Sequence, residues 1–255
     1  MGRFVLLGQH IGYSASPAMQ NAAFAALGLP HRYELADIPV VDLPTALAAL
    51  RHGEDLGGNV TTPHKLAVAE LVDEMDDGAA RVGAVNTVVR RDGALVGLNT
   101  DLPAMVDAVM ALRPNARHAV VLGGGGAGRA VLLALEDAGA RRVTRVSRDD
   151  WSDIPQLLAD ADLLVNATPI GTGSHETPVP AELLRRDLAV LDLVYRPSPT
   201  RLVLDARAAG APARGGAGIL LGQGWRSLEA WLGVPAPIEV MRQALRIELG
   251  ESADV

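Results

Sequence analysis

The chain contains no cysteine among its 255 residues. Disulfide bonds, thiol catalysis and zinc sites made of cysteine are therefore excluded. Aromatic residues make up only 3% of the sequence, although hydrophobic residues make up 49%. The core must be built mainly from Ala, Leu and Val, a composition that suits parallel sheets covered by helices.

Long apolar runs and basic clusters are also missing. No stretch approaches the roughly 20 apolar residues that a membrane helix requires, and the apolar run at residues 4–7 is too short for a signal peptide. A net charge of −7 without a long basic run argues against nucleic acid as a partner. The histidines show no metal-ligand spacing. We expect a soluble, cytoplasmic protein without a metal, a nucleic-acid partner or a membrane segment.

Short apolar runs alternate with helical patterns, which is typical of an α/β fold. In the first hundred residues we predict strands at 4–7, 33–36, 57–61, 86–89 and 94–98, the last two forming a hairpin around Arg91-Asp92-Gly93. We predict helices capped by Ser16, over 43–50 and from Pro63 onward.

The pattern from residue 103 onward predicts a doubly wound sheet. Strands are expected at 120–122, 143–146, 163–166 and 190–193, and helices at 104–112, 127–138 and 238–249. We therefore predict two α/β domains. Residues 1–102, with a C-terminal helix in 237–255, form a substrate domain, and residues 103–236 form a Rossmann-like dinucleotide-binding domain.

The run Gly123-Gly124-Gly125-Gly126-Ala127-Gly128 follows an apolar strand and opens a helix. This context makes a dinucleotide-binding turn credible, because Gly125 lets the backbone approach a pyrophosphate at the helix N-terminus. Ser147-Arg148-Asp149 follows about 20 residues later, where the adenosine ribose is expected. Arg148 suits the 2′-phosphate of NADP, whereas Asp149 suits the free hydroxyls of NAD. A methyltransferase would use a similar loop, so the loop alone leaves the cofactor open.

A lysine and an aspartate, each within a run of small polar residues, are suited to carbonyl–alcohol redox chemistry. Lys65 ends Asn59-Val60-Thr61-Thr62-Pro63-His64-Lys65, and Asp101 ends Asn99-Thr100-Asp101. Reducing a ketone by hydride transfer builds negative charge on oxygen, and a nearby ammonium can donate the proton. Taken alone, such a pair is more often a surface ion pair, so the surrounding motifs carry the argument.

These motifs resemble the shikimate dehydrogenase family in order and spacing over essentially the whole chain. Besides the two segments above, the resemblance rests on Ser14-Ala15-Ser16-Pro17, Gly83-Ala84-Val85-Asn86-Thr87, the glycine-rich turn, Asn166-Ala167-Thr168-Pro169, Val194-Tyr195-Arg196-Pro197 and Gln223. It implies reversible NADP-linked reduction of 3-dehydroshikimate to shikimate, a step of aromatic amino-acid biosynthesis, in a monomer or homodimer.

The resemblance also implies site residues. Lys65 would be the acid/base with Asp101 as its partner. The substrate would be bound by Ser14, Ser16 and Tyr195 near its carboxylate, and by Thr61, Asn86, Asp101 and Gln223 at its ring hydroxyls. The cofactor would be bound by Asp77, Gly123, Gly125, Gly126, Ala127, Gly128, Ser147, Arg148, Thr168, Leu193 and Gly216.

Three segments depart from the family pattern. Ser147-Arg148-Asp149 replaces Asn-Arg-Thr, and Ser152 replaces a basic residue, which leaves NAD possible. Leu102-Pro103-Ala104-Met105 and Gln223-Gly224 also differ, next to the substrate pocket. Quinate or an aminoshikimate therefore remain alternative substrates. A catalytically silent nucleotide-binding sensor of the same fold is a further alternative, although such a protein has no need of both Lys65 and Asp101.

Overall fold

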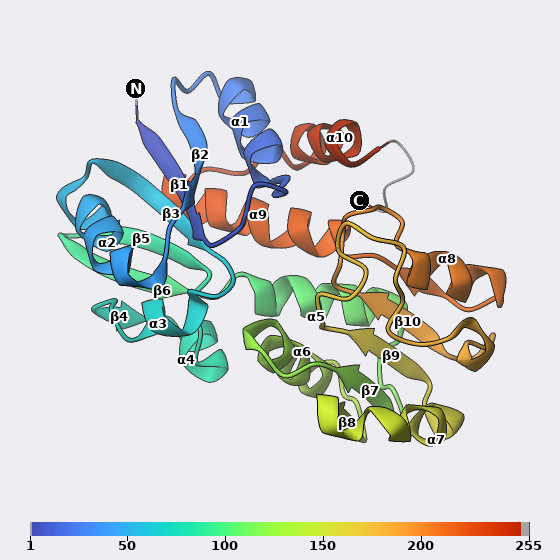
Figure 1. Cartoon of the computed structure of the whole chain (residues 1–255). Helices are drawn as coiled ribbons and strands as arrows, with labels where there is room; N and C mark the ends of the chain where they lie inside the picture. The colour runs from blue at the N-terminus through green and yellow to red at the C-terminus, as the bar shows by residue number, and fades with distance from the viewer. Residues whose placement is uncertain (1, 251–254) are drawn as a thin grey trace. The chain divides into compact units, whose positions relative to one another are not determined.

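The computed structural model describes residues 2–250 and 255, apart from the side chain of Arg148 (Figure 1). The chain divides into two compact units. One comprises Met1–Asp101 and Leu221–Glu248, and the other comprises Leu102–Leu220 and Leu249–Val255. The sequence predicts that residues 221–236 belong to the second domain. The structure places them with the first, because side chains from this segment pack into that unit's core.

The first unit is built on a mixed six-stranded sheet of order β2-β1-β3-β5-β6-β4. Its strands are β1 (Arg3–Gly8), β2 (Arg32–Asp37), β3 (Asp55–Val60), β4 (Glu74–Met75), β5 (Thr87–Arg91) and β6 (Ala94–Leu98). Its helices are α1 (Ser16–Ala26), α2 (Leu43–His52), α3 (Lys65–Ala69), α4 (Asp77–Val82) and α10 (Ile238–Leu249), with a 3-10 helix at Val40–Asp42. The predicted hairpin is confirmed as β5–β6.

Side chains alternate between the two faces of this sheet, and each face has its own core. Val5, Leu7 and Val60 pack with the buried leucines of α2 on one face. On the other face, Phe4 lies 4.9 Å from Phe24 of α1, measured between ring centroids. The Phe4 ring also lies 5.0 Å from Trp231 in the helix α9 (Ala217–Leu232).

The second unit contains a parallel five-stranded sheet of order β11-β10-β9-β7-β8, the doubly wound arrangement that the sequence predicts. Its strands are β7 (Ala119–Leu122), β8 (Val143–Val146), β9 (Leu163–Asn166), β10 (Ala189–Asp192) and β11 (Ala213–Arg214). Its helices are α5 (Asp101–Leu112), α6 (Gly126–Asp137), α7 (Ile154–Asp160), α8 (Arg201–Ala208) and the start of α9, with 3-10 helices at Arg148–Asp153 and Ala181–Leu183 (Figure 1).

Two predicted helix starts are wrong. Ser16 is the first residue of α1 rather than its cap; the cap position is Ala15, which makes no side-chain capping bond. The helix after Pro63 begins only at Lys65, because the His64 N–H first closes a turn onto the Thr61 carbonyl at 2.9 Å.

Three other differences concern short or proline-containing elements. Helix α5 begins at Asp101 rather than residue 104, because Pro103 sits in the first turn, where no N–H donor is needed. Helix α4 was not predicted; the Asp76 carboxylate caps it by accepting the Ala79 N–H at 2.7 Å. The two-residue strands β4 and β11 were also not predicted. No helix in the described part of the chain is long and apolar enough to cross a membrane.

Candidate active site

Four segments leave the sheet of the first unit at the same edge. β1 and β3 are adjacent and parallel, with Leu7 opposite Val60, so the chain emerges from both at that edge. β5 begins there and β6 ends there, because Thr87 is opposite both Asn59 and Leu98 in antiparallel pairs. The edge therefore brings together the segments that carry six predicted site residues: Ser14, Ser16, Thr61, Lys65, Asn86 and Asp101.

Lys65 and Asp101 form a direct ion pair. Lys65 Nζ donates to Asp101 Oδ2 at 2.5 Å, although 36 residues separate them in the chain. The side chains are 17% and 11% exposed, so both are shielded while an edge of each still reaches solvent. Asp101 is the first residue of α5, where the helix dipole favours a carboxylate. This geometry provides an amine held in place by a charged partner, which is what proton transfer to or from an alcohol needs.

Asn86 lies in a buried polar network. Its side chain is 2% exposed; the amide nitrogen donates to Thr100 Oγ1 at 2.9 Å, and the amide oxygen accepts the Thr100 N–H at 2.8 Å. Thr100 directly precedes Asp101. The hydrogen bonds of Asn86 therefore hold Thr100 in place, and with it the start of α5 at the catalytic candidate Asp101.

Sequence reasoning missed the centre of this network, which lies at Asn59 and Ser227. Asn59 Nδ2 donates to Ser227 Oγ at 2.9 Å and to Thr87 Oγ1 at 3.0 Å, and Tyr33 Oη donates to Asn59 Oδ1 at 2.8 Å. Ser227 is fully buried and donates to the Gln223 carbonyl at 2.9 Å. These contacts connect α9 to the sheet edge across 168 residues of sequence, a separation that no local pattern signals.

The remaining substrate candidates of the first unit also have defined places. The Ser16 N–H donates to Ser14 Oγ at 3.3 Å, so the two serines form one compact turn after β1. The residue after Gln223 is Gly224, where the family commonly has alanine. A Cβ there would lie 2.1 Å from Met19 Cε, and Gln20 Nε2 donates to the Gly224 carbonyl at 2.9 Å. The glycine thus permits close packing of α1 on α9 beside Gln223.

Two other candidates stay predictions. Asp77 is exposed at the start of α4 in the first unit. Tyr195 follows β10 in the second unit, together with most cofactor candidates.

In the second unit, the strand order reverses between β7 and β9, and ligands of doubly wound sheets bind outside such a switch point. The glycine-rich turn joins β7 to α6 at this place. A Cβ at Gly125 or Gly126 would meet no atom within 4 Å, so the turn offers an open surface at the N-terminus of a twelve-residue helix. Such a surface fits a pyrophosphate.

Two glycines allow close approaches behind this surface. Gly123 has φ +106°, and a Cβ there would lie 2.8 Å from the Ala167 carbonyl oxygen. A Cβ at Gly216 would lie 2.1 Å from the Leu193 carbonyl oxygen. The structure therefore brings Gly123 against the segment that contains Thr168, and Gly216 against Leu193. All four residues are predicted cofactor contacts.

The segment expected at the adenosine ribose begins a 3-10 helix. Ser147 Oγ donates to Asp150 Oδ2 at 2.6 Å, in a capping box for the following 3-10 helix. The side chain of Arg148 lies outside the described part. Sequence reasoning missed Arg145, whose Nη1 would lie 3.6 Å from a Cβ at Gly124. The signal for it in the sequence was a basic residue within the predicted strand 143–146, two residues before Ser147.

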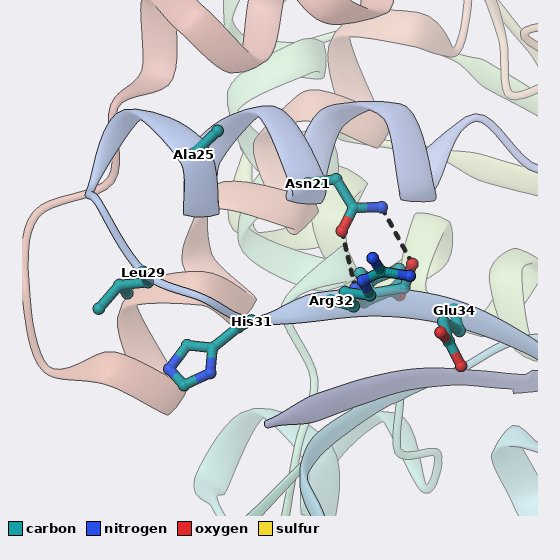
Figure 2. A pocket seen from close by; sticks show the side chains of 7 residues that line it. Asn21, Ala25, Leu29, His31, Arg32 and Glu34 are labelled. Carbon is teal, nitrogen blue, oxygen red and sulfur yellow. Dashed lines mark hydrogen bonds between the residues drawn. The ribbon is translucent and has the colours of Figure 1, made fainter. Parts of the chain in front are cut away.

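A pocket of about 460 Å³ lies elsewhere in the first unit, between α1 and β2. Figure 2 shows Asn21 reaching from α1 to the edge strand, where its amide accepts the Tyr33 N–H at 2.8 Å and donates to the Tyr33 carbonyl at 3.0 Å. None of the residues that line this pocket is a predicted site residue. Asn21 serves there to satisfy the open edge of the sheet.

Comparisons with known proteins agree with the motifs. The family model described as the shikimate dehydrogenase substrate binding domain matches residues 6–88, and the model of the shikimate 5′-dehydrogenase C-terminal domain matches residues 216–246. In the described part of the chain, no group of three or more histidine or acidic residues could hold a metal ion.

Relatives match over nearly the whole chain. A shikimate dehydrogenase (NADP(+)) from Halobacterium salinarum is 43% identical over 98% of this chain and 100% of the relative. One from Methanopyrus kandleri is 39% identical over 94% and 93%. The crystal structure of shikimate 5-dehydrogenase from Thermus thermophilus in complex with NADP(H) and shikimate has a TM-score of 0.87 and 37% identity, covering 98% of this chain and 100% of that one. The chain belongs to the shikimate dehydrogenase family.

Proposed function

We propose that this protein is an NADP-dependent shikimate dehydrogenase, which interconverts shikimate and 3-dehydroshikimate. The observation that carries the proposal is the shielded Lys65–Asp101 pair at the polar edge of the first unit. The named activity and cofactor of the relatives support it. They do not favour the alternatives of a methyltransferase, a silent sensor, or an enzyme for quinate or an aminoshikimate.

Lys65 acts as the acid and base in this proposal. The second unit would hold NADP⁺, which would supply the hydride acceptor for oxidation of the carbinol carbon of shikimate. The proton of the same hydroxyl passes to the Lys65 amine, and in the reverse direction the Lys65 ammonium returns it to the carbonyl oxygen. Asp101 holds Nζ in position and stabilises the ammonium form by its negative charge.

The polar side chains at the same edge read the substrate. A small polyhydroxylated acid is distinguished mainly by hydrogen bonds, because a mismatched ligand leaves buried donors unpaired. We assign the carboxylate to Ser14 and Ser16, and the ring hydroxyls to Thr61, Asn86, Asp101 and Gln223. Tyr195 is assigned to the substrate from the motif alone. The Asn86 amide carries two N–H groups, and Thr100 uses one of them, so a second can serve the ligand.

The cofactor is assigned to the second unit. We assign the pyrophosphate to the backbone of the glycine-rich turn, at Gly123, Gly125, Gly126, Ala127 and Gly128. We assign the rest of the dinucleotide to Thr168, Leu193 and Gly216. Arg148 and Arg145 provide positive charge for the 2′-phosphate of NADP, near Ser147. Asp77 is assigned to the cofactor from the motif alone.

The test is absorbance at 340 nm with purified protein and shikimate or quinate, each with NADP⁺ or NAD⁺. We expect the highest kcat/KM for shikimate with NADP⁺. A signal confined to quinate would mean that the departures at residues 102–105 and 224 have redirected the site. Silence in all four reactions would contradict the proposed function.

A further inference from the structure

Asp192, at the end of β10, is a buried carboxylate that the proposed mechanism does not use. It is 1% exposed and accepts three hydrogen bonds. Asn166 Nδ2 donates to Oδ1 at 2.9 Å, the Val194 N–H donates to Oδ1 at 3.0 Å, and Thr200 Oγ1 donates to Oδ2 at 2.7 Å. Burial raises the pKa of Asp192 to about 6, and the three donors oppose that shift.

The first donor connects Asp192 to the loop after β9. Because Asn166 Nδ2 points at Asp192, its amide oxygen is turned the other way, toward Thr168. That oxygen accepts the Thr168 N–H at 3.0 Å and the Thr168 hydroxyl at 2.6 Å. Asn166 Nδ2 also donates to the Ile170 carbonyl at 3.2 Å, so the acceptor at position 192 and this carbonyl together fix which end of the Asn166 amide faces Thr168. The same loop lies against Gly123, through the Ala167 carbonyl.

The second donor connects Asp192 to the loop after β10. The Val194 N–H bond holds the chain just past Leu193, whose own N–H donates to the Asn166 carbonyl at 2.9 Å. The Gly216 N–H donates to the Val194 carbonyl at 3.1 Å, and Gly216 lies against the Leu193 carbonyl. Asp192 thus connects both loops that carry predicted cofactor contacts, one beside the glycine-rich turn and one beside Gly216.

We propose that Asp192 is a positioning residue for the dinucleotide: it holds the loops at Thr168 and at Leu193 in the arrangement that receives the cofactor. The inference rests on the proposed cofactor site. A neutral amide of the same shape would still fill the space, but it keeps one acceptor in place of two. It would present an N–H either to Asn166 and the Val194 N–H, which donate, or to Thr200, whose hydroxyl would have to turn and accept. The loops would lose a fixed orientation while the fold is kept.

The chain offers a matched control at the opposite end of the same sheet. Asp162, which directly precedes β9, is likewise buried, at 3% exposure. Its carboxylate accepts the backbone N–H groups of Arg117 and His118. It touches neither cofactor loop. Asp162→Asn therefore removes a buried carboxylate of the same unit without the proposed role.

The experiment measures the dissociation constants of NADP⁺ and of shikimate, each alone, by fluorescence titration, together with the thermal midpoint. Asp192→Asn is expected to weaken NADP⁺ binding about tenfold, to leave shikimate binding within about twofold, and not to lower the midpoint. Asp162→Asn is expected to lower the midpoint and leave NADP⁺ binding unchanged.

A double variant tests the route through Asn166. If Asp192 acts through that amide, Asp192→Asn adds little to the loss of NADP⁺ affinity already caused by Asn166→Ala. Additive losses would overturn this route. Should Asp192→Asn not fold, Thr200→Val removes the donor to Oδ2 together with the α8 cap that accepts the Val203 N–H, and a roughly threefold weaker NADP⁺ affinity is expected. Unchanged NADP⁺ affinity in the Asp192 or Thr200 variant would overturn the inference, whereas a wild-type protein that binds no NADP⁺ would overturn the proposed function itself.

Discussion

The Lys65–Asp101 ion pair of the candidate site differs from the surface ion pairs in how little its side chains are exposed. In the Arg3–Asp55 and Arg201–Asp205 pairs the arginine is 52% exposed, and in Arg51–Asp73 it is 37% exposed. Pairs of this kind contribute little to stability. Lys65 and Asp101 are both more shielded than these arginines, so their charges interact more strongly and hold one geometry. Shielding with a residual opening is what a proton-transfer group requires.

Cofactor choice is also decided by single residues. Arg148→Ala is expected to raise the dissociation constant for NADP⁺ by about tenfold and to change that for NAD⁺ by less than about twofold, because only NADP⁺ carries the 2′-phosphate that a guanidinium binds. Titration of both nucleotides checks this. Equal losses for the two would show that Arg148 does not touch the 2′-phosphate.

Residue-level reasoning from sequence succeeded where a motif carries its own context. Lys65 and Asp101 were predicted to pair, and the structure joins them directly. The supporting residues Ser227, Asn59 and Asp192 were not predicted, because a lone buried polar residue looks the same in sequence whether it braces a site or only satisfies its own neighbours.

At the scale of elements, the turn between β7 and α6 shows how backbone shape makes a binding surface. Gly123→Ala would place a Cβ 2.8 Å from the Ala167 carbonyl, at a φ of +106°. Residues other than glycine rarely adopt that backbone conformation, so the turn or the loop at residues 166–168 must shift. We expect at least a roughly tenfold weaker NADP⁺ affinity by titration, with shikimate binding retained. An alanine variant that binds NADP⁺ as tightly as the wild type would contradict this view of the turn.

Elements with local signals were predicted well. The hairpin at β5–β6 and the strands β7, β8 and β9 follow from turn residues and apolar runs. Short elements were not: α4 depends on the Asp76 cap, and β4 consists of two residues that pair with β6. Such segments are ordered by tertiary partners, which periodicity does not reveal.

At the scale of the whole molecule, the segment Leu221–Glu248 completes the core of the first unit. Trp231 packs on Phe4, and its Nε1–H donates to the Val88 carbonyl at 3.1 Å. Trp231→Ala is expected to lower the free energy of unfolding by roughly 3 kcal/mol, measured by urea denaturation. Ile247→Ala on α10, a residue 73% exposed, is the control and is expected to change it by less than about 0.5 kcal/mol. Equal effects would mean that α9 does not complete this core.

The pH dependence of stability is a second property of the whole molecule. The folded protein raises the pKa of Asp192 from 3.8 to about 6, because burial disfavours the charged form. A carboxyl with a raised pKa binds its proton more tightly when folded, so its contribution to stability is lost as pH rises from about 4 to about 6. A shift of about two units corresponds to about 3 kcal/mol.

Asp192→Asn removes this titration. The variant's stability relative to wild type should therefore increase by about 3 kcal/mol between about pH 4 and pH 7. Urea denaturation of both proteins at each pH measures the difference. Parallel curves would show that Asp192 is not held with a raised pKa.

The most direct test of the central claim is the rate of NADPH formation at 340 nm from shikimate and NADP⁺, measured for the wild type and for Lys65→Ala. We predict wild-type turnover that falls by roughly 10²–10⁴-fold in the variant, with the dissociation constant of NADP⁺ nearly unchanged. Turnover that survives the loss of Lys65 would contradict the assignment of this lysine as the acid and base.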